Sequence, residues 1–170
     1  MCQATHMTTL DITGYWSSLD LYQGTPEEDA LALAADGTGW YDWSSMGGGF
    51  EVLRFRWDIA ETGELTLRMA MYLQGTWSKG SQPGKPFYHI AEQRPMDQTR
   101  RTNYTIGPAL NALRRPVTVL ALADRVVTGQ RFALVRTRVD AEDYPIFKPD
   151  PQSCSITSPT CRFSATTGCG

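Results

Sequence analysis

The residues of this 170-residue chain that could do chemistry are few. The chain has two histidines, His6 and His89, and Glu92 follows His89 by three positions. On a β-strand, side chains three residues apart point to opposite faces, so we expect no catalytic pair between them. No Gly-x-Ser-x-Gly motif, Ser/His/Asp spacing or phosphate-binding glycine loop is present. The sequence therefore predicts no standard hydrolase or nucleotide site.

Asp42 draws attention because it lies between Tyr41 and Trp43 and shares a strand face with Trp40. If that face points inward, burial would raise the pKa of Asp42 and the carboxyl group could donate a proton. The plainer interpretation, which we favour, places Asp42 outward beside a turn. The polar groups to test for a catalytic role are therefore Asp42, Tyr41, Tyr72, Tyr88 and Arg136.

The four cysteines are Cys2, Cys154, Cys161 and Cys169. They form no Cys-x-x-Cys pair and have no histidine beside the last three, so we expect no metal site and no cofactor. We expect free thiols, because the chain begins without a cationic and apolar secretory signal and we predict a cytoplasmic protein.

Composition is ordinary for a globular protein, with 41% hydrophobic residues, 20% charged residues and a net charge of −2. The longest basic runs are the pairs 100–101 and 114–115, so we expect no nucleic-acid partner. No stretch approaches the roughly 20 apolar residues that span a bilayer, so we expect no membrane partner.

Alternation of apolar and polar residues is clearest over 50–59, where Leu53, Phe55 and Trp57 share one face. After a turn, the same alternation predicts a strand whose one face carries Leu65, Leu67, Met69, Met71 and Leu73. The two strands predict a hairpin with a shared apolar side. Further strands are expected near 30–35, 38–44, 87–92, 103–106, 117–122 and 131–138, with a loop at 74–86.

Two segments carry helical signals. Residues 25–28 show a capping pattern, with Thr25 as the cap, Pro26 first in the helix and Glu28 closing the box, although Leu31 and Leu33 suit a strand. We favour one helical turn at 26–29 that leads into a strand, and a short helix within 107–116. The predicted fold is mainly β: a single antiparallel up-and-down β-barrel of about eight strands with one or two short helical turns.

The predicted barrel domain covers residues 11–147. It follows a disordered start at 1–10 and precedes a tail at 148–170 that is rich in Pro, Ser, Thr and Cys.

The stretch Gly14–Tyr15–Trp16 at the start of a strand, followed by a meander of about eight strands, resembles the lipocalins and the wider calycin group. The resemblance implies that Trp16 plugs one end of the barrel and that Arg136 or Arg138 lies over its ring. Simple alternation, however, puts Trp16 on the face of the polar residues at 18 and 20. A bulge near 17–18 would be needed to bring Trp16 and the leucines that follow inside together.

The aromatic and methionine side chains predict a wall for a small apolar ligand. The residues proposed to line it are Trp43, Leu53, Phe55, Trp57, Met69, Met71, Phe132, Leu134 and Arg136. The first hypothesis is a lipocalin-like protein that binds a small apolar or aromatic molecule. The alternatives are a cofactor-independent cyclase or isomerase that uses the barrel cavity, and a structural or partner-binding domain whose barrel is filled.

Overall fold

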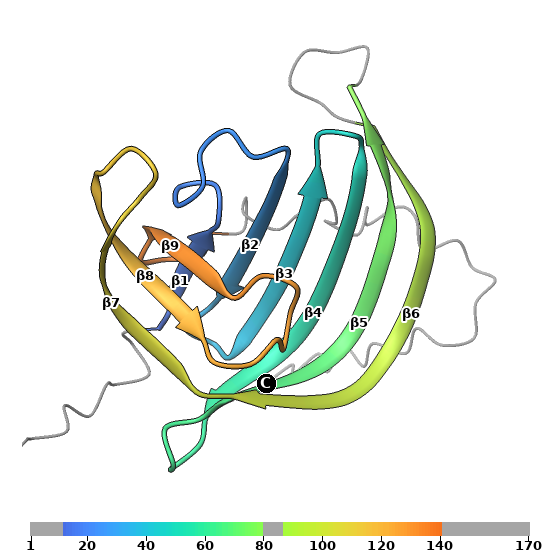
Figure 1. Ribbon diagram of the computed structural model, residues 1–170. Helices are drawn as coiled ribbons and strands as arrows, with labels where there is room; N and C mark the ends of the chain where they lie inside the picture. The colour runs from blue at the N-terminus through green and yellow to red at the C-terminus, as the bar shows by residue number, and fades with distance from the viewer. Residues whose placement is uncertain (1–11, 80–86, 141–170) are drawn as a thin grey trace, which may run out of the picture.

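The computed structural model describes residues 12–79 and 87–140, which form one antiparallel sheet of nine strands (Figure 1). In chain order the strands are β1 (Gly14–Ser17), β2 (Glu27–Leu33), β3 (Thr38–Ser45), β4 (Gly49–Ile59), β5 (Leu65–Ser78), β6 (Phe87–Thr102), β7 (Tyr104–Leu110), β8 (Pro116–Leu122) and β9 (Arg131–Arg136). The predicted start at 1–10 and tail at 148–170, and with them all four cysteines, lie outside the described residues.

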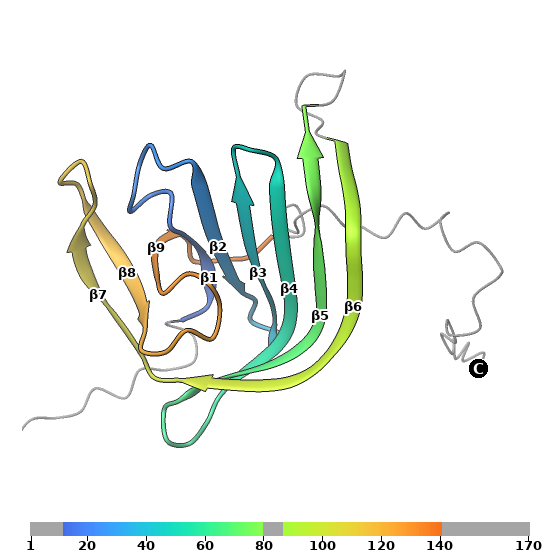
Figure 2. The same ribbon diagram turned by 45° about the vertical axis from the view of Figure 1, so that its right-hand side comes forward.

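The strands follow one another across the sheet in the order β6-β5-β4-β3-β2-β1-β9-β8-β7. Every neighbouring pair except β1 and β9 is consecutive in the chain, which is an up-and-down arrangement. The sheet curls strongly, and β6 runs into β7 at one end of the curl (Figures 1 and 2). The predicted mainly-β antiparallel fold is confirmed. Within the described ranges β6 and β7 share no ladder, so these strands form a curled sheet that is not closed.

Both predicted helical turns are wrong, since residues 12–79 and 87–140 contain no helix. Residues 27–29 begin β2, where Glu27 and Glu28 pair with Ser45 and Ser44 of β3. A capping pattern is a local preference, and here the cross-strand ladder outweighs it. Residues 107–116 form the end of β7, a turn and the start of β8. With no helix in the described ranges, none there is long and apolar enough to cross a membrane.

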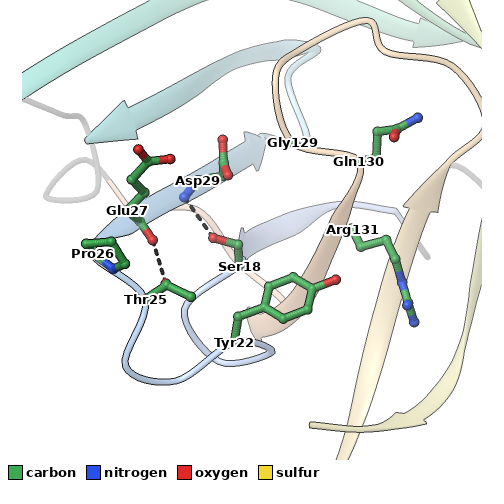
Figure 3. A pocket seen from close by; sticks show the side chains of 9 residues that line it. All are labelled: Ser18, Tyr22, Thr25, Pro26, Glu27, Asp29, Gly129, Gln130 and Arg131. Atoms are coloured by element: carbon green, nitrogen blue, oxygen red, sulfur yellow. Dashed lines mark hydrogen bonds between the residues drawn. The ribbon is translucent and has the colours of Figure 1, made fainter. Parts of the chain in front are cut away.

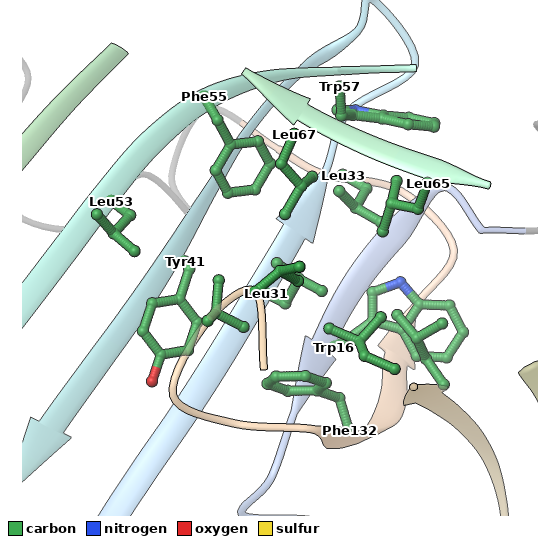
Figure 4. Close-up of a cluster of buried hydrophobic side chains, with 14 of the residues drawn as sticks. Trp16, Leu31, Leu33, Tyr41, Leu53, Phe55, Trp57, Leu65, Leu67 and Phe132 are labelled. Carbon is green, nitrogen blue, oxygen red and sulfur yellow. The ribbon is translucent and has the colours of Figure 1, made fainter. Parts of the chain in front are cut away.

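The main core lies on the concave face of the sheet (Figure 4). Leu31, Tyr41 and Leu53 are paired across β2, β3 and β4 and all belong to it. The connection between β8 and β9 adds Val126 and Val127, both buried. A guanidinium nitrogen of Arg100 donates to the backbone oxygen of Val126 at 2.6 Å and holds this connection against β6. Apolar side chains and this connection therefore fill part of the concave side.

The predicted hairpin of β4 and β5 is present, but a bulge changes the face of its second half. Phe55 pairs with Met69 and Arg54 pairs with Met71, so Ala70 is the extra residue. One extra residue moves every following side chain to the other face. Met69 stays in the main core, whereas Met71 packs against a second cluster on the convex face, formed by Phe50, Val52 and Leu73. The prediction that Met71 lines the same wall as Met69 is wrong.

Trp16 is fully buried in the main core, and its indole nitrogen donates to the backbone oxygen of Ile12 at 3.0 Å. The irregularity that changes the register lies between Tyr15 and Trp16, against β9, and not at 17–18. It sets Arg136 opposite Tyr15, with the guanidinium carbon 5.1 Å from the centre of the tyrosine ring. The arginine predicted to cover Trp16 therefore stacks on Tyr15. Arg138 instead forms an ion pair with Asp140 at 3.0 Å.

Candidate ligand-binding site

A row of mostly polar side chains crosses the concave face next to the main core. Residues paired directly across antiparallel strands point to the same face. The register from β2 to β6 therefore joins one row, which we call the concave row: Asp29, Trp43, Glu51, Gln74 and Glu92. Three of its five members are carboxylates, and Trp43 is its aromatic member.

The adjoining row of the same strands is the boundary of the core. It contains Leu31, Tyr41, Leu53, Tyr72 and Arg94. Leu53 is a core residue, and Trp43 and Tyr72 are partly buried side chains that pack against the core. The concave face thus changes from apolar to polar between two adjacent rows, which lie two residues apart along each strand. A molecule with an apolar body and polar groups matches such a boundary.

Tyr72 is held by contacts on two sides. The guanidinium carbon of Arg94 lies 4.8 Å from the centre of its ring, and its hydroxyl group donates to the side-chain oxygen of Gln74 at 2.9 Å. Arg94 in turn pairs with Glu92 at 2.9 Å. Burial, together with the negative charge of Glu51, raises the pKa of Tyr72, so its phenol stays protonated.

Asp29 and Tyr41 form a second polar pair, which has a different character. The phenol of Tyr41 donates to a carboxylate oxygen of Asp29. Burial, and then the hydrogen bond to Asp29, raise the pKa of Tyr41. Burial is also the main reason why the pKa of Asp29 is raised, and the charge of Glu27 adds to it. Because Tyr41 is buried and its hydroxyl group is occupied, the pair ties β2 to β3 and offers no free catalytic acid.

A cavity of about 420 Å³ opens at the rim of the sheet, between the β1–β2 connection and the start of β9 (Figure 3). Its lining consists of Ser18, Tyr22, Thr25, Pro26, Glu27, Asp29, Gly129, Gln130 and Arg131. In Figure 3 the carboxylates of Glu27 and Asp29 point away from the guanidinium group of Arg131, so no acid and base face one another. The cavity meets the concave row at Asp29, and the indole nitrogen of Trp43 lies 3.4 Å from a Glu27 oxygen.

The residues predicted to be catalytic do not form one cluster, although Tyr88 lies near enough to Asp42 for burial, and then the charge of Asp42, to raise the pKa of Tyr88. Tyr41 and Tyr72 face the concave side, while Tyr88 packs in the convex cluster with its ring edge-on to Phe50 at 5.8 Å. Arg136 is exposed beside Tyr15.

Asp42 lies on the face opposite Tyr41, away from the main core, so the hypothesis that it points into the barrel is wrong. Its pKa is nevertheless raised, to about 7, by burial and by the charges of Glu28 and Asp29.

The residues predicted to bind a ligand divide into three groups. Four of them fill the core and are almost completely buried: Phe55, Trp57, Met69 and Phe132. Trp43, Leu53 and Leu134 lie at its boundary. Met71 and Arg136 lie elsewhere, because a register shift in each strand pair changes their position.

The sequence analysis missed Glu51, Gln74 and Glu92, and assigned Asp29 to a helix start. Nothing in their local sequence marks these residues, since they are ordinary polar positions of amphipathic strands. The signal that finds them is the register: only the pairing of five strands shows that they share a row with Trp43.

Among the described residues, no group of three or more His, Cys, Asp or Glu side chains is placed to hold a metal ion. Comparisons with protein-family models, curated proteins and solved structures found no match to this chain.

Proposed function

We propose that this protein is a lipocalin-like binding protein that holds a small apolar or aromatic molecule on the concave face, beside Trp43. The observation that carries the proposal is the position of Trp43. It is half-buried at the boundary between the apolar core and the carboxylates of the concave row. An aromatic side chain that is not sealed in the core, and that has no ring partner among the described residues, offers a stacking surface to a ligand.

The neighbours of Trp43 define what the ligand must carry. Glu51 pairs with Trp43 on one side and Asp29 on the other, and Leu53 lies one step further into the core. An apolar body would cover Leu53, Trp43 and Tyr72, while hydrogen-bond donors of the ligand would face the carboxylates. A negatively charged group would be repelled there. The ligand class is therefore neutral or donor-bearing and aromatic or apolar.

Two fluorescent dyes that share one framework test this directly. N-phenyl-1-naphthylamine is apolar and carries an N–H donor, and 8-anilinonaphthalene-1-sulfonate adds a negative charge to the same skeleton. We expect the neutral dye to bind about fivefold or more tightly than the sulfonate, because one unfavourable charge contact contributes about 1 kcal/mol. Equal binding of the two dyes, or binding of neither to the folded protein, would overturn the proposal.

Two variants test whether the dye binds beside Trp43. Trp43→Leu keeps an apolar side chain but removes the stacking surface, and should weaken binding of the neutral dye. Glu51→Gln should reduce the discrimination between the dyes. Glu61→Gln is the matched control, because Glu61 is exposed in the turn between β4 and β5 and lies in neither row. If Glu61→Gln also lost the discrimination between the two dyes, the binding site would lie outside the concave row.

A cofactor-independent cyclase or isomerase is the second candidate, favoured by the carboxylate of Glu51, whose charge adds to burial in raising the pKa of Tyr72. A carboxylate beside a phenol that stays protonated combines a base with a hydrogen-bond donor on one face. Such an enzyme needs little more than a surface that holds a flexible substrate in a reactive conformer. Turnover that is abolished by both Glu51→Gln and Tyr72→Phe, with dye binding retained in Tyr72→Phe, would distinguish the enzyme from the carrier.

A further inference from the structure

Two turns from opposite parts of the chain lie side by side at one corner of the molecule. The backbone nitrogen of Ala112, in the β7–β8 turn, donates to the backbone oxygen of Leu21 in the β1–β2 connection at 3.0 Å. Leu21 is buried below them with Val119 and Ala133. Figures 1 and 2 both show the two turns next to each other. The corner is therefore a single surface, which neither turn forms alone.

Several exposed apolar side chains belong to the segments that meet at this corner. Six large hydrophobic side chains are exposed within the described ranges, and four of these lie in the two connections or at the end of β7: Leu19 at 40%, Tyr22 at 45%, Leu110 at 62% and Leu113 at 54%. Arg114 and Arg115 follow Leu113 directly and are also exposed. We call these six residues the turn surface. Single exposed hydrophobic residues need no explanation, but a group of four beside two cations does.

The β7–β8 turn is fixed in the conformation that displays these side chains. The side-chain oxygen of Asn111, itself buried, accepts hydrogen bonds from the backbone nitrogens of Leu113 at 3.0 Å and Arg115 at 2.9 Å. Arg114 has a φ of 58°, in the left-handed region that glycine or asparagine adopts with less strain. The hydrogen bonds of the turn hold Arg114 in this strained conformation.

We propose that the turn surface binds the headgroup layer of an anionic phospholipid membrane. Leu110 and Leu113 would enter the boundary between headgroups and acyl chains, and Tyr22 suits the same depth. Arg114 and Arg115 would pair with lipid phosphates, for which the planar guanidinium group is well shaped. The apolar side chains stand in the two connections and at the end of β7, and not across a flat sheet face, which fits insertion between headgroups better than docking of a complementary protein surface.

This inference is independent of the proposed ligand and differs in kind from the membrane contact excluded in the sequence analysis. That expectation concerned apolar segments long enough to span a bilayer. A peripheral contact needs only a few apolar side chains and nearby cations. The exposed Asp20, beside Leu19, opposes binding to an anionic surface and limits its strength.

Co-sedimentation with large vesicles is the test. We expect the protein to sediment with vesicles of phosphatidylcholine and phosphatidylserine but to stay in solution with phosphatidylcholine alone. Binding should weaken as salt is added, because the charge contribution is screened. Arg114→Gly, which also suits the left-handed backbone, should weaken binding about fivefold. Asp20→Asn should strengthen it, and the double variant Leu110→Ser with Leu113→Ser should reduce it about tenfold.

Matched controls come from the rest of the chain. Met46 is 80% exposed in the turn between β3 and β4, so Met46→Ser removes an exposed apolar side chain outside the turn surface. Arg125→Gln removes an exposed arginine elsewhere, and neither control should change vesicle binding. Absence of sedimentation with anionic vesicles, equal binding to neutral vesicles, or an equal loss in the controls would overturn the proposal. So would self-association of the wild type that the Leu110/Leu113 variant abolishes without any vesicle binding, since the surface would then be a protein contact.

Discussion

Tyr41 donates its phenolic hydrogen to Asp29 on the neighbouring strand, at the level where the apolar core meets the concave row. Tyr41 is buried, while Asp29 also lines the rim cavity. One hydrogen bond therefore connects the core, the row and the cavity. The pair holds the strand that carries Asp29 in place for whatever binds beside Trp43.

The hydrogen bond from Tyr41 to Asp29 should contribute measurably to the free energy of unfolding. Tyr41→Phe leaves the half-buried Asp29 without its donor, and we expect a loss of about 1–3 kcal/mol in the free energy of unfolding. Urea unfolding followed by circular dichroism measures it. Tyr22→Phe is the control, because Tyr22 is exposed and should lose almost nothing. Equal stability of Tyr41→Phe and wild type would contradict the role given to this hydrogen bond.

Asp42 should make stability depend on pH. Its pKa in the folded protein is about 7, above the ordinary value of 3.8. Between these two pH values the carboxyl group is protonated in the folded state and ionised in the unfolded state. Stability due to this group is complete below pH 4 and falls as the pH rises through 7. Since Asp42 keeps some contact with solvent, we expect a loss of about 2 kcal/mol, smaller than full burial would give.

Comparison of Asp42→Asn with wild type isolates this effect. The variant should be more stable than wild type at pH 8 and about equal to it near pH 4. Asp20→Asn, at an exposed position, should not gain stability relative to wild type between pH 4 and pH 8. Unfolding curves in urea at several pH values would decide, and a variant that gains nothing at pH 8 would contradict the assignment.

Two glycines in strands should respond differently to the same substitution. A Cβ atom at Gly75 would meet the backbone oxygen of His89 and the ring of Phe50, whereas one at Gly107 would meet nothing within 4 Å. We expect Gly75→Ala to lose about 3 kcal/mol and Gly107→Ala to lose almost nothing. Thermal unfolding measures both. Similar melting temperatures for the two variants would contradict the close approach of β5 to β6.

The bulge at Ala70 gives a prediction about two methionines. Met69→Ala should lose about 2–4 kcal/mol, since Met69 is buried in the main core, and Met71→Ala should lose less because Met71 is only half-buried. Binding of N-phenyl-1-naphthylamine should be unchanged in Met71→Ala, whose side chain lies on the convex face. Weakened dye binding in Met71→Ala would indicate that both methionines lie on the concave face, which would contradict the bulge at Ala70.

The sequence was sufficient to locate most strands but not their bounds or their register: residues 74–78, expected in a loop, belong to β5, and β6 extends from Phe87 to Thr102. Alternation located Leu53, Phe55 and Trp57 on one face, and the structure buries all three in the main core. Alternation cannot locate a bulge, because one extra residue changes the face of Met71 without leaving a mark on composition. Alternation also could not locate the register shift between β1 and β9 that sets Arg136 opposite Tyr15.

Long-range pairing also decided two other outcomes. The capping pattern at 25–28 was a sound local signal, yet Glu27 and Glu28 pair with β3. The concave row could not be predicted at all, because Asp29 and Glu92 are brought into line only by the pairing of five strands.

The position of the ligand is tested most directly by the indole N–H resonances of the tryptophans, followed by nuclear magnetic resonance during titration with N-phenyl-1-naphthylamine. Trp43 lies on the concave face and Trp40 on the opposite face of the same strand, and Trp43→Leu assigns the first resonance. We predict a saturable shift of the Trp43 resonance with little change at Trp40. A shift at Trp40 alone, or no shift at Trp43 when the dye is bound, would contradict a ligand site on the concave face.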